Sequence, residues 1–181
     1  MSLYQKLSIW GPKLFSKAWV FKNGFNWSPM YRRSTGKIVF VSEDLRDIRV
    51  EIPLNWKNRN YANSMFGGSM FSSVDPIPMV QLLNIIGKDY VVWDKSAEIQ
   101  FKRPAKEKLY AHFVFTEEEI QNIHETLSHK NEMELPKTTL LTNATGEVIF
   151  CEVSKVLYIA KKEYYKAKRA KRTQSEPKRS S

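Results

Sequence analysis

The sequence lacks disulfide chemistry and any apolar run long enough to cross a membrane. It contains one cysteine, Cys151, in 181 residues, so no intrachain disulfide can form and small disulfide-stabilised scaffolds are excluded. No apolar run reaches the ~18 residues that a transmembrane helix needs. Lysines are spread through residues 1–21 without a separate apolar segment, which predicts no secretory signal peptide. These absences lead us to expect a cytoplasmic protein.

Common signatures of cofactor, metal and nucleic-acid binding are also missing. The sequence has no glycine-rich nucleotide loop and no Gly-x-Ser-x-Gly turn. Of its three histidines, His124 and His129 are five residues apart, which places them on different faces of a helix. We therefore expect no cofactor and no metal. Without zinc-finger spacing or a helix-turn-helix pattern, we also expect no nucleic-acid partner.

Positive charge is concentrated toward the C-terminal end of the sequence. The formal net charge is +10, and residues 161–181 contribute +7 of it through nine Lys or Arg and two Glu. We expect this segment to be a basic, flexible tail, because charged chain ends seldom pack. The alternative is that the tail contacts an anionic membrane surface.

A period-two alternation of apolar and charged residues predicts six strands. Ile38, Ile48 and Val50 alternate with charged residues on either side of a turn, which is typical of a half-buried hairpin. Thr116 and Glu119 form a capping box at the start of a short amphipathic helix. The four later strands are expected within residues 89–104, 108–116 and 135–162, the last range containing two.

A long apolar segment lies between the second and third strands. It opens on two glycines near residue 67 and stays apolar, except that Asp75 and two prolines interrupt it. Proline lacks the N–H that a helix interior needs, so we expect two helical segments, about 67–74 and 76–86, joined at Asp75. The Asp75 carboxylate is then expected either to cap the second segment or to face a ligand.

These elements define the expected fold class, which is α+β. No β-α-β alternation is present, so one long helix against one antiparallel sheet is the simplest arrangement. We expect residues 1–35 to be a helical lead-in that packs on the domain and residues 36–160 to form the domain. Residues 161–181 are expected to follow it as the tail.

The start of the long helix carries a family resemblance. Asn63 precedes the run Phe66-Gly67-Gly68, and Asp75 follows on the helix at the spacing found in hotdog-fold thioesterase-like proteins. The chain therefore resembles that superfamily, in particular its phenylacetate-type acyl-CoA thioesterase branch. Within that superfamily, the sequence most resembles an uncharacterised bacterial group of hotdog domains of unknown function, the DUF4442-like group. Two departures are that Phe66 replaces the usual histidine and that a proline follows Asp75.

The resemblance implies a hotdog fold, in which a sheet of about six strands is wrapped round one central helix. It also implies that the protein is an acyl-CoA thioesterase. It implies that Asp75 activates water or attacks the thioester directly, and that the N–H groups of Gly67 and Gly68 polarise the thioester oxygen. It also implies that the site lies at the interface of a homodimer, with a tetramer as a further possibility. The residues then expected to contact the substrate are Asn63, Phe66 and Ser69.

Two other interpretations stay open at this level. The chain is alternatively a non-catalytic hotdog protein that binds an acyl chain or acyl thioester, or an assembly subunit. Gly67 and Gly68 would then only let the helix pack closely.

Asp94 and Lys95 are adjacent in the third strand, and we expect them to form a surface or interface pair.

Overall fold

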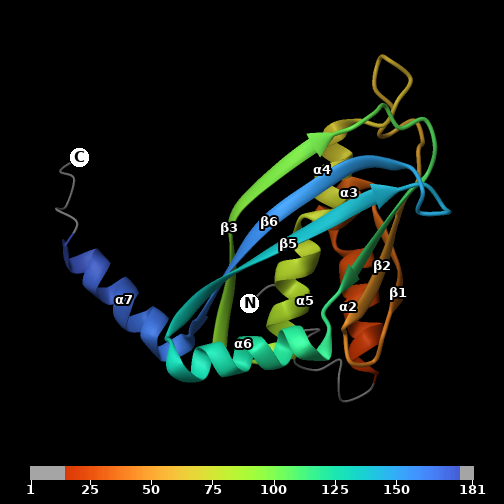
Figure 1. The fold of residues 1–181 in the computed structure, drawn as a ribbon. Coiled ribbons are helices and arrows are strands. Elements are labelled where there is room, and N and C mark those ends of the chain that lie inside the picture. Colours follow the sequence, from red (N-terminus) through yellow and green to blue (C-terminus); the bar gives the residue numbers. More distant parts are fainter. Residues whose placement is uncertain (1–14, 176–181) are drawn as a thin grey trace.

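Six antiparallel strands form one sheet around a central helix in the computed structural model, which describes residues 15–175 (Figure 1). This confirms the predicted α+β class and the order of the elements. The sheet order is β1-β2-β4-β5-β6-β3, so β1 and β3 are its edges. In chain order the elements are α2 (Lys17–Trp27), α3 (Pro29–Ser34), β1 (Lys37–Val41), β2 (Asp47–Ile52), α4 (Gly67–Val74), α5 (Pro76–Ile86), β3 (Tyr90–Phe101), β4 (Leu109–Val114), α6 (Glu117–His129), β5 (Glu132–Thr142), β6 (Ile149–Lys161) and α7 (Lys162–Ser175).

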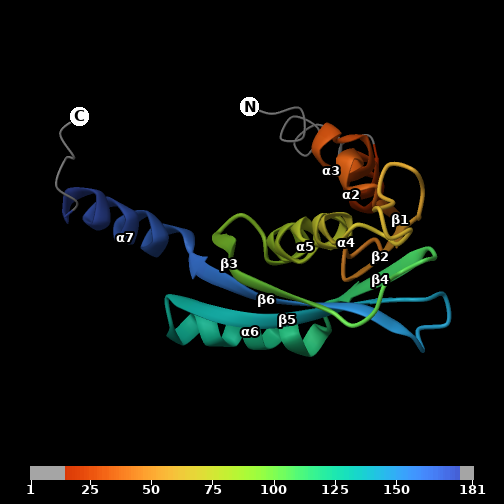
Figure 2. The same ribbon diagram turned by 90° about the horizontal axis from the view of Figure 1, so that it is seen from above.

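The central helix consists of α4 and α5 and covers one face of the sheet (Figure 2). Its two segments coincide with those expected from the prolines. Asp75, between them, keeps helical dihedral angles, with φ −49° and ψ −52°, and its N–H donates to the carbonyl of Phe71 at 2.9 Å. The chain therefore stays helical through the joint, although Pro76 and Pro78 supply no N–H there.

The inner face of β6 forms the floor beneath this helix. Alternate residues along the strand are buried and face the core, as the period of two requires. Four of the five in this row are apolar, and the fifth, Lys155, is only 3% exposed. The apolar members are Cys151, Val153, Leu157 and Ile159.

Two neighbouring strands separate partway along the sheet. β4 and β5 pair only at Tyr110–Thr142 and Ala111–Leu141. Beyond these pairs, Nζ of Lys137 reaches the carbonyl of Val114 at 3.0 Å and supplies a hydrogen bond that the sheet does not. The predicted capping box also forms at the start of α6, which closes the lower end of the sheet in Figure 1.

The N-terminal helices pack on the edge of the domain that carries β1. The side-chain amide of Asn26 donates to the carbonyl of Ile38 at 2.8 Å and accepts from the N–H of Ile38 at 2.9 Å, which ties α2 to β1. The hydroxyl of Tyr31, fully buried, donates to the carbonyl of Ser73 at 2.9 Å and ties α3 to α4. At the other end of the chain, α7 leaves the body of the domain (Figure 1).

Candidate functional site

A buried lysine joins the central helix to the edge strand. The ammonium of Lys155 donates to Oδ1 of Asp75 at 2.8 Å and to the carbonyl oxygen of Asp75 at 2.6 Å. It also forms an ion pair with Asp94, whose Oδ2 lies 2.8 Å away. Its side chain is 2% exposed, and these three oxygen atoms surround its ammonium. Because a buried ammonium loses its hydration, two carboxylates and a carbonyl are the partners needed to offset that loss.

Each member of this cluster is positioned by a different element. Lys155 occupies an inward position of β6 between Val153 and Leu157. Val92, two residues earlier on β3, is buried on the inner face, so the period of two places Asp94 on the same face. The register of β3 against β6 shifts only after this residue, between Asp94 and Ser96. The third member, Asp75, lies at the joint of the central helix.

The predicted pair between Asp94 and Lys95 is wrong. Asp94 bonds Lys155, whereas the ammonium of Lys95 pairs with Glu134 on β5. Adjacent residues of a strand point to opposite faces, so the two side chains cannot readily meet. The alternation of β3 therefore separates an inward carboxylate from an outward ammonium.

The Asp75 carboxylate does not cap α5. No side-chain capping bond is present at this helix start, and Oδ1 of Asp75 is directed to Lys155 instead. The side chain stays 40% exposed, and its second oxygen, Oδ2, accepts no hydrogen bond from residues 15–175. With two partly exposed carboxylates around one ammonium, the cluster carries more negative than positive formal charge.

The glycines at the start of α4 leave two backbone donors available. The N–H groups of Gly67 and Gly68 make no hydrogen bond with the described residues, as is usual in the first turn of a helix. Aromatic rings lie close to both: an added Cβ would come within 2.6 Å of the Phe101 ring at Gly67 and 2.3 Å of the Phe66 ring at Gly68. The glycines thus permit close packing and also expose N–H groups, so both interpretations of them are compatible.

The expected substrate-contacting residues are in three different environments. Phe66 is 58% exposed beside the free N–H groups, where its ring could meet a ligand. Ser69 is 7% exposed on the buried side of α4 and offers little surface for contact. Asn63 lies exposed in the preceding turn with a positive φ of 58°, a conformation that asparagine tolerates well. Of these three residues, Phe66 is therefore the one best placed to contact a substrate.

Within one chain, the donors and the acid are too far apart for one reacting carbonyl. Asp75 follows Gly67 by eight positions, which is a rise of about 12 Å along a helix. A shared site therefore needs these groups from two copies of the chain. β3 ends the sheet and most of its residues are exposed, so this edge is open to a second strand.

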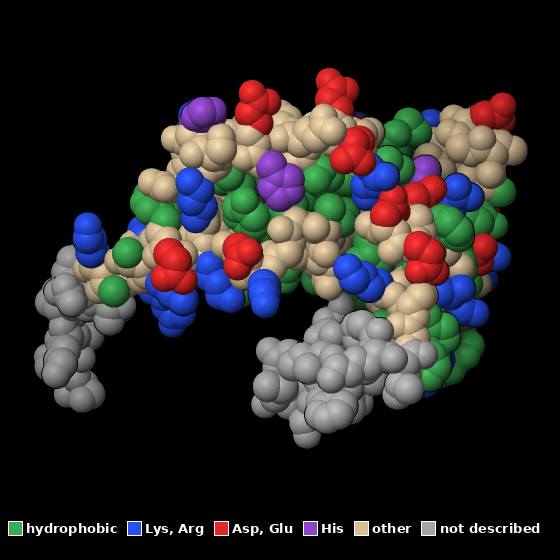
Figure 3. Space-filling model, turned by 90° about the horizontal axis from the view of Figure 1, so that it is seen from below, with side chains coloured by type: hydrophobic (Ala, Val, Ile, Leu, Met, Phe, Trp, Pro, Cys, Tyr) green, Lys and Arg blue, Asp and Glu red, His purple; other side chains and the backbone are tan. Residues whose placement is uncertain are grey.

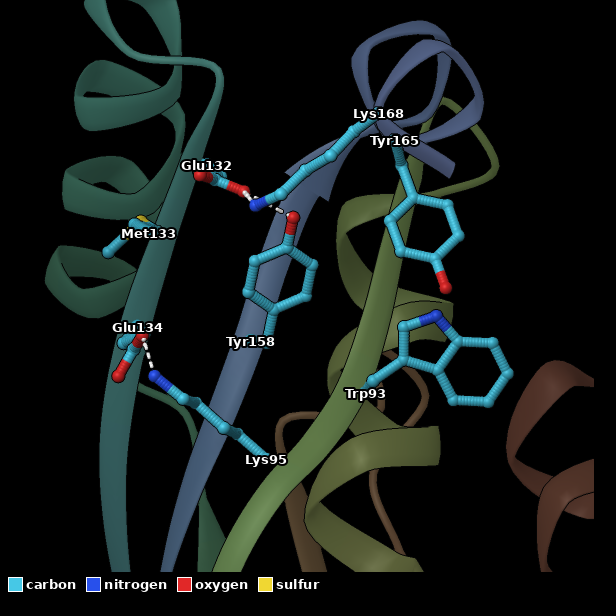
Figure 4. A pocket seen from close by; sticks show the side chains of 8 residues that line it. All are labelled: Trp93, Lys95, Glu132, Met133, Glu134, Tyr158, Tyr165 and Lys168. Carbon is cyan, nitrogen blue, oxygen red and sulfur yellow. Dashed lines mark hydrogen bonds and ion pairs between the residues drawn. The ribbon is translucent and has the colours of Figure 1, made fainter. Parts of the chain in front are cut away.

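A separate hollow lies on the outer face of the sheet beside α7 (Figure 4). Trp93, Tyr158 and Tyr165 line it, but its two cations already have partners. Lys168 bonds Glu132 at 2.5 Å, and Lys95 pairs with Glu134. Because its charges are balanced, we do not assign a ligand here. In residues 15–175, no three His, Cys, Asp or Glu side chains gather as a metal site.

The chain belongs to the family described as Domain of unknown function (DUF4442), whose model matches residues 11–159. No curated protein matches the sequence. None of the helices in residues 15–175 is both long and apolar enough to span a membrane.

Solved structures share its fold. A protein of unknown function from Pseudomonas aeruginosa, described as a probable thioesterase, is 20% identical with a TM-score of 0.62 over 72% of this chain and 85% of that one. A protein of unknown function from Chlorobaculum tepidum is 16% identical, with a TM-score of 0.62 over 77% and 91%. A Haemophilus influenzae thioesterase is 10% identical, with a TM-score of 0.57 over 80% and 91%. The hotdog fold is thereby established.

Sequence reasoning missed Lys155, although a signal was present. Its position two residues from both Val153 and Leu157 places it on the apolar face of a predicted strand. A lysine in such a row needs an anionic partner, and this requirement points to an acidic residue on the facing helix.

Proposed function

We propose that the protein hydrolyses an acyl thioester, such as an acyl-CoA, at a site formed between two copies. The observation that carries the proposal is the Asp75 carboxylate, which Lys155 holds through Oδ1 while the side chain stays 40% exposed and Oδ2 has no hydrogen-bond partner in residues 15–175. The free N–H groups of Gly67 and Gly68 from the other copy supply the complementary donors.

The proposed reaction uses these groups in two roles. Asp75 accepts a proton from water as the water oxygen attacks the thioester carbon. The negative charge that develops on the carbonyl oxygen is stabilised by the N–H groups at the start of α4, where the helix dipole is positive. The carbon–sulfur bond then breaks, the thiolate takes a proton, and a carboxylic acid and a thiol are released.

A panel of CoA thioesters from acetyl to palmitoyl tests this proposal directly. Wild-type protein should release free CoA above the buffer rate, and Asp75→Asn should lower kcat by about 100-fold or more, as loss of a general base does. A matched control is Asp44→Asn, which removes an exposed carboxylate of the β1–β2 turn and should leave kcat unchanged. If the wild-type protein hydrolyses none of the thioesters, the enzymatic proposal fails.

The second candidate function is non-catalytic binding of an acyl chain or acyl thioester. It is favoured by the engagement of Asp75 as a counter-ion of Lys155 and by Phe66, which replaces the histidine usual in hotdog-fold thioesterase-like proteins. Native mass spectrometry of protein freshly purified from cells would detect a retained acyl ligand. A retained ligand without turnover of any thioester supports this second function over the first.

Both functions are proposed for a homodimer. Pairing of β3 with its copy would continue the sheet and remove its exposed edge. Light scattering should give a mass twice the 21.2 kDa of one chain, or four times if a tetramer forms. A mass of one chain at all concentrations would exclude a site shared between copies.

A further inference from the structure

Helix α5 is apolar on two opposite sides. Ile77, Leu82 and Ile86 are buried and face the sheet. Met79, Val80 and Leu83 lie on the other side, where they are only partly buried. A helix that is apolar all round is normally covered on every side, so the outer side of α5 is suited to an apolar occupant.

A groove of about 880 Å³ runs over this outer side. Val20 and Phe21 of α2 contribute one wall, and Val91 and Val92 of β3 contribute the other. The volume is within the range of small-molecule sites, which is roughly 300–1,000 Å³. The length of α5, about 16 Å for 11 residues, suits an extended hydrocarbon chain.

Three lysines line the groove, and no carboxylate does. Lys17 begins α2, Lys88 follows the end of α5, and Lys162 begins α7. All three elements have these ends at the lower side of the molecule in Figure 1, and Figure 3 shows basic side chains gathered along the edge at the base of α7. The ammonium of Lys162 donates to the carbonyl of Lys88 at 3.2 Å, which fixes it beside the end of α5.

These cations differ from those of the hollow beside α7. There, Lys95 and Lys168 are each paired with a glutamate, whereas Lys17, Lys88 and Lys162 form no ion pair within residues 15–175. Lys88 and Lys162 are also favoured by the negative end of the α5 dipole, but Lys17 comes from another helix. An apolar groove with unneutralised cations at one end is complementary to an anionic amphiphile.

We propose that this groove binds a single long-chain fatty acid. Its carboxylate lies beside Lys88 and Lys162, and its chain follows Met79, Val80 and Leu83 toward the joint at Asp75, with Lys17 on the opposite wall. The inference gives a site and a ligand to the second candidate function, binding of an acyl chain. It does not depend on thioester hydrolysis, because a free acid has no thioester bond to cleave.

Titration with palmitate by calorimetry, at low ionic strength and below the micelle concentration, tests the proposal. Wild-type protein should bind, and palmityl alcohol, which lacks the charge, should bind about tenfold or more weakly. Lys88→Gln with Lys162→Gln should weaken palmitate binding about tenfold and reduce its salt dependence. The matched control, Lys106→Gln with Lys130→Gln, removes two exposed lysines outside the groove and should change the affinity less than about twofold.

A steric variant separates the groove from other surfaces. Leu83→Trp fills the groove from a partly buried position and should abolish palmitate binding while the thermal unfolding midpoint stays close to wild type. Equal binding by Leu83→Trp, equal binding of the alcohol, or no binding by wild type overturns the proposal. If Leu83→Trp instead lowers the oligomeric mass and palmitate does not bind wild type, the groove is a contact between copies. Thioester turnover, measured separately, can fail or succeed independently of all these outcomes.

Discussion

The ammonium of Lys155 lies 2.8 Å from Oδ1 of Asp75 and 2.6 Å from the carbonyl oxygen of the same residue. One side chain therefore holds both the carboxylate and the backbone of the joint in the central helix. A proline-containing joint has fewer internal hydrogen bonds than a regular helix, so a contact from the sheet contributes to its rigidity. The same contact aims the carboxylate away from its own helix.

Removal of this ammonium should destabilise the fold strongly. Lys155→Met leaves Asp75 and Asp94 near each other without a cation, and we expect a loss of about 3 kcal/mol in the free energy of unfolding. Lys95→Met is the control, since its ion pair is exposed and should contribute less than about 1 kcal/mol. Urea denaturation measures both.

A triple variant checks the physical reason for that loss. Combining Lys155→Met with Asp75→Asn and Asp94→Asn removes the unpaired charges and should recover most of the stability. If the triple variant is no more stable than Lys155→Met alone, lost packing rather than unpaired charge explains the effect.

Two glycines with close neighbours should respond differently to alanine. At Gly36, an added Cβ would lie 2.8 Å from Cβ and Oγ of Ser73, which is fully buried, so Gly36→Ala should cost about 1–3 kcal/mol. At Gly68, the obstructing Phe66 ring is 58% exposed and can swing away, so Gly68→Ala should change stability by less than about 1 kcal/mol. Thermal unfolding of both variants compares them, and equal costs would contradict this assignment.

The attachment of α7 should weaken at low pH. The carboxylate of Glu132 accepts hydrogen bonds from Lys168 and from the hydroxyls of Tyr158 and Tyr164, as Figure 4 shows for the first two. Bonds from Lys168 and Tyr158 lower the pKa of Glu132, and burial beside this carboxylate raises the pKa of Tyr158 to about 12. A lowered carboxyl pKa stabilises the folded state above its ordinary value of 4.5, and this contribution is lost as the pH falls through the lower folded-state value.

Limited trypsin digestion at neutral pH measures that attachment. Glu132→Gln should speed cleavage within α7, because the helix loses the partner of Lys168, while Glu163→Gln, on α7 itself and exposed, should not. The stability difference between wild type and Glu132→Gln should be constant at neutral pH and shrink below about pH 4.5. A difference that persists unchanged in acid would contradict the role of the ionised carboxylate.

Cys151 should be unreactive in the folded protein. It is fully buried, and burial raises the pKa of its thiol to about 11. At pH 8 only about one thiol in a thousand would then be the reactive thiolate. Ellman's reagent should detect no thiol until urea is added and one thiol afterwards, so released CoA can be assayed without interference. Rapid labelling of native protein would show that the inner face of β6 opens.

Local patterns along the chain were sufficient for the fold class and for the division of the central helix. Alternation in β2 and β6, the capping box at Thr116 and Glu119, and the prolines after Asp75 each depend on neighbouring residues. The spacing of Gly67, Gly68 and Asp75 also identified the family, because it lies within one short segment.

The partners of Asp75 were decided only by the tertiary structure. Lys155 is eighty residues away along the chain, and Asp94 comes within reach of it only because β3 pairs with β6. Sequence alone left the Asp75 carboxylate between its own helix and a ligand. Folding placed one of its oxygens, Oδ1, against a buried ammonium, because an ammonium that loses its hydration needs anionic partners from elsewhere in the chain.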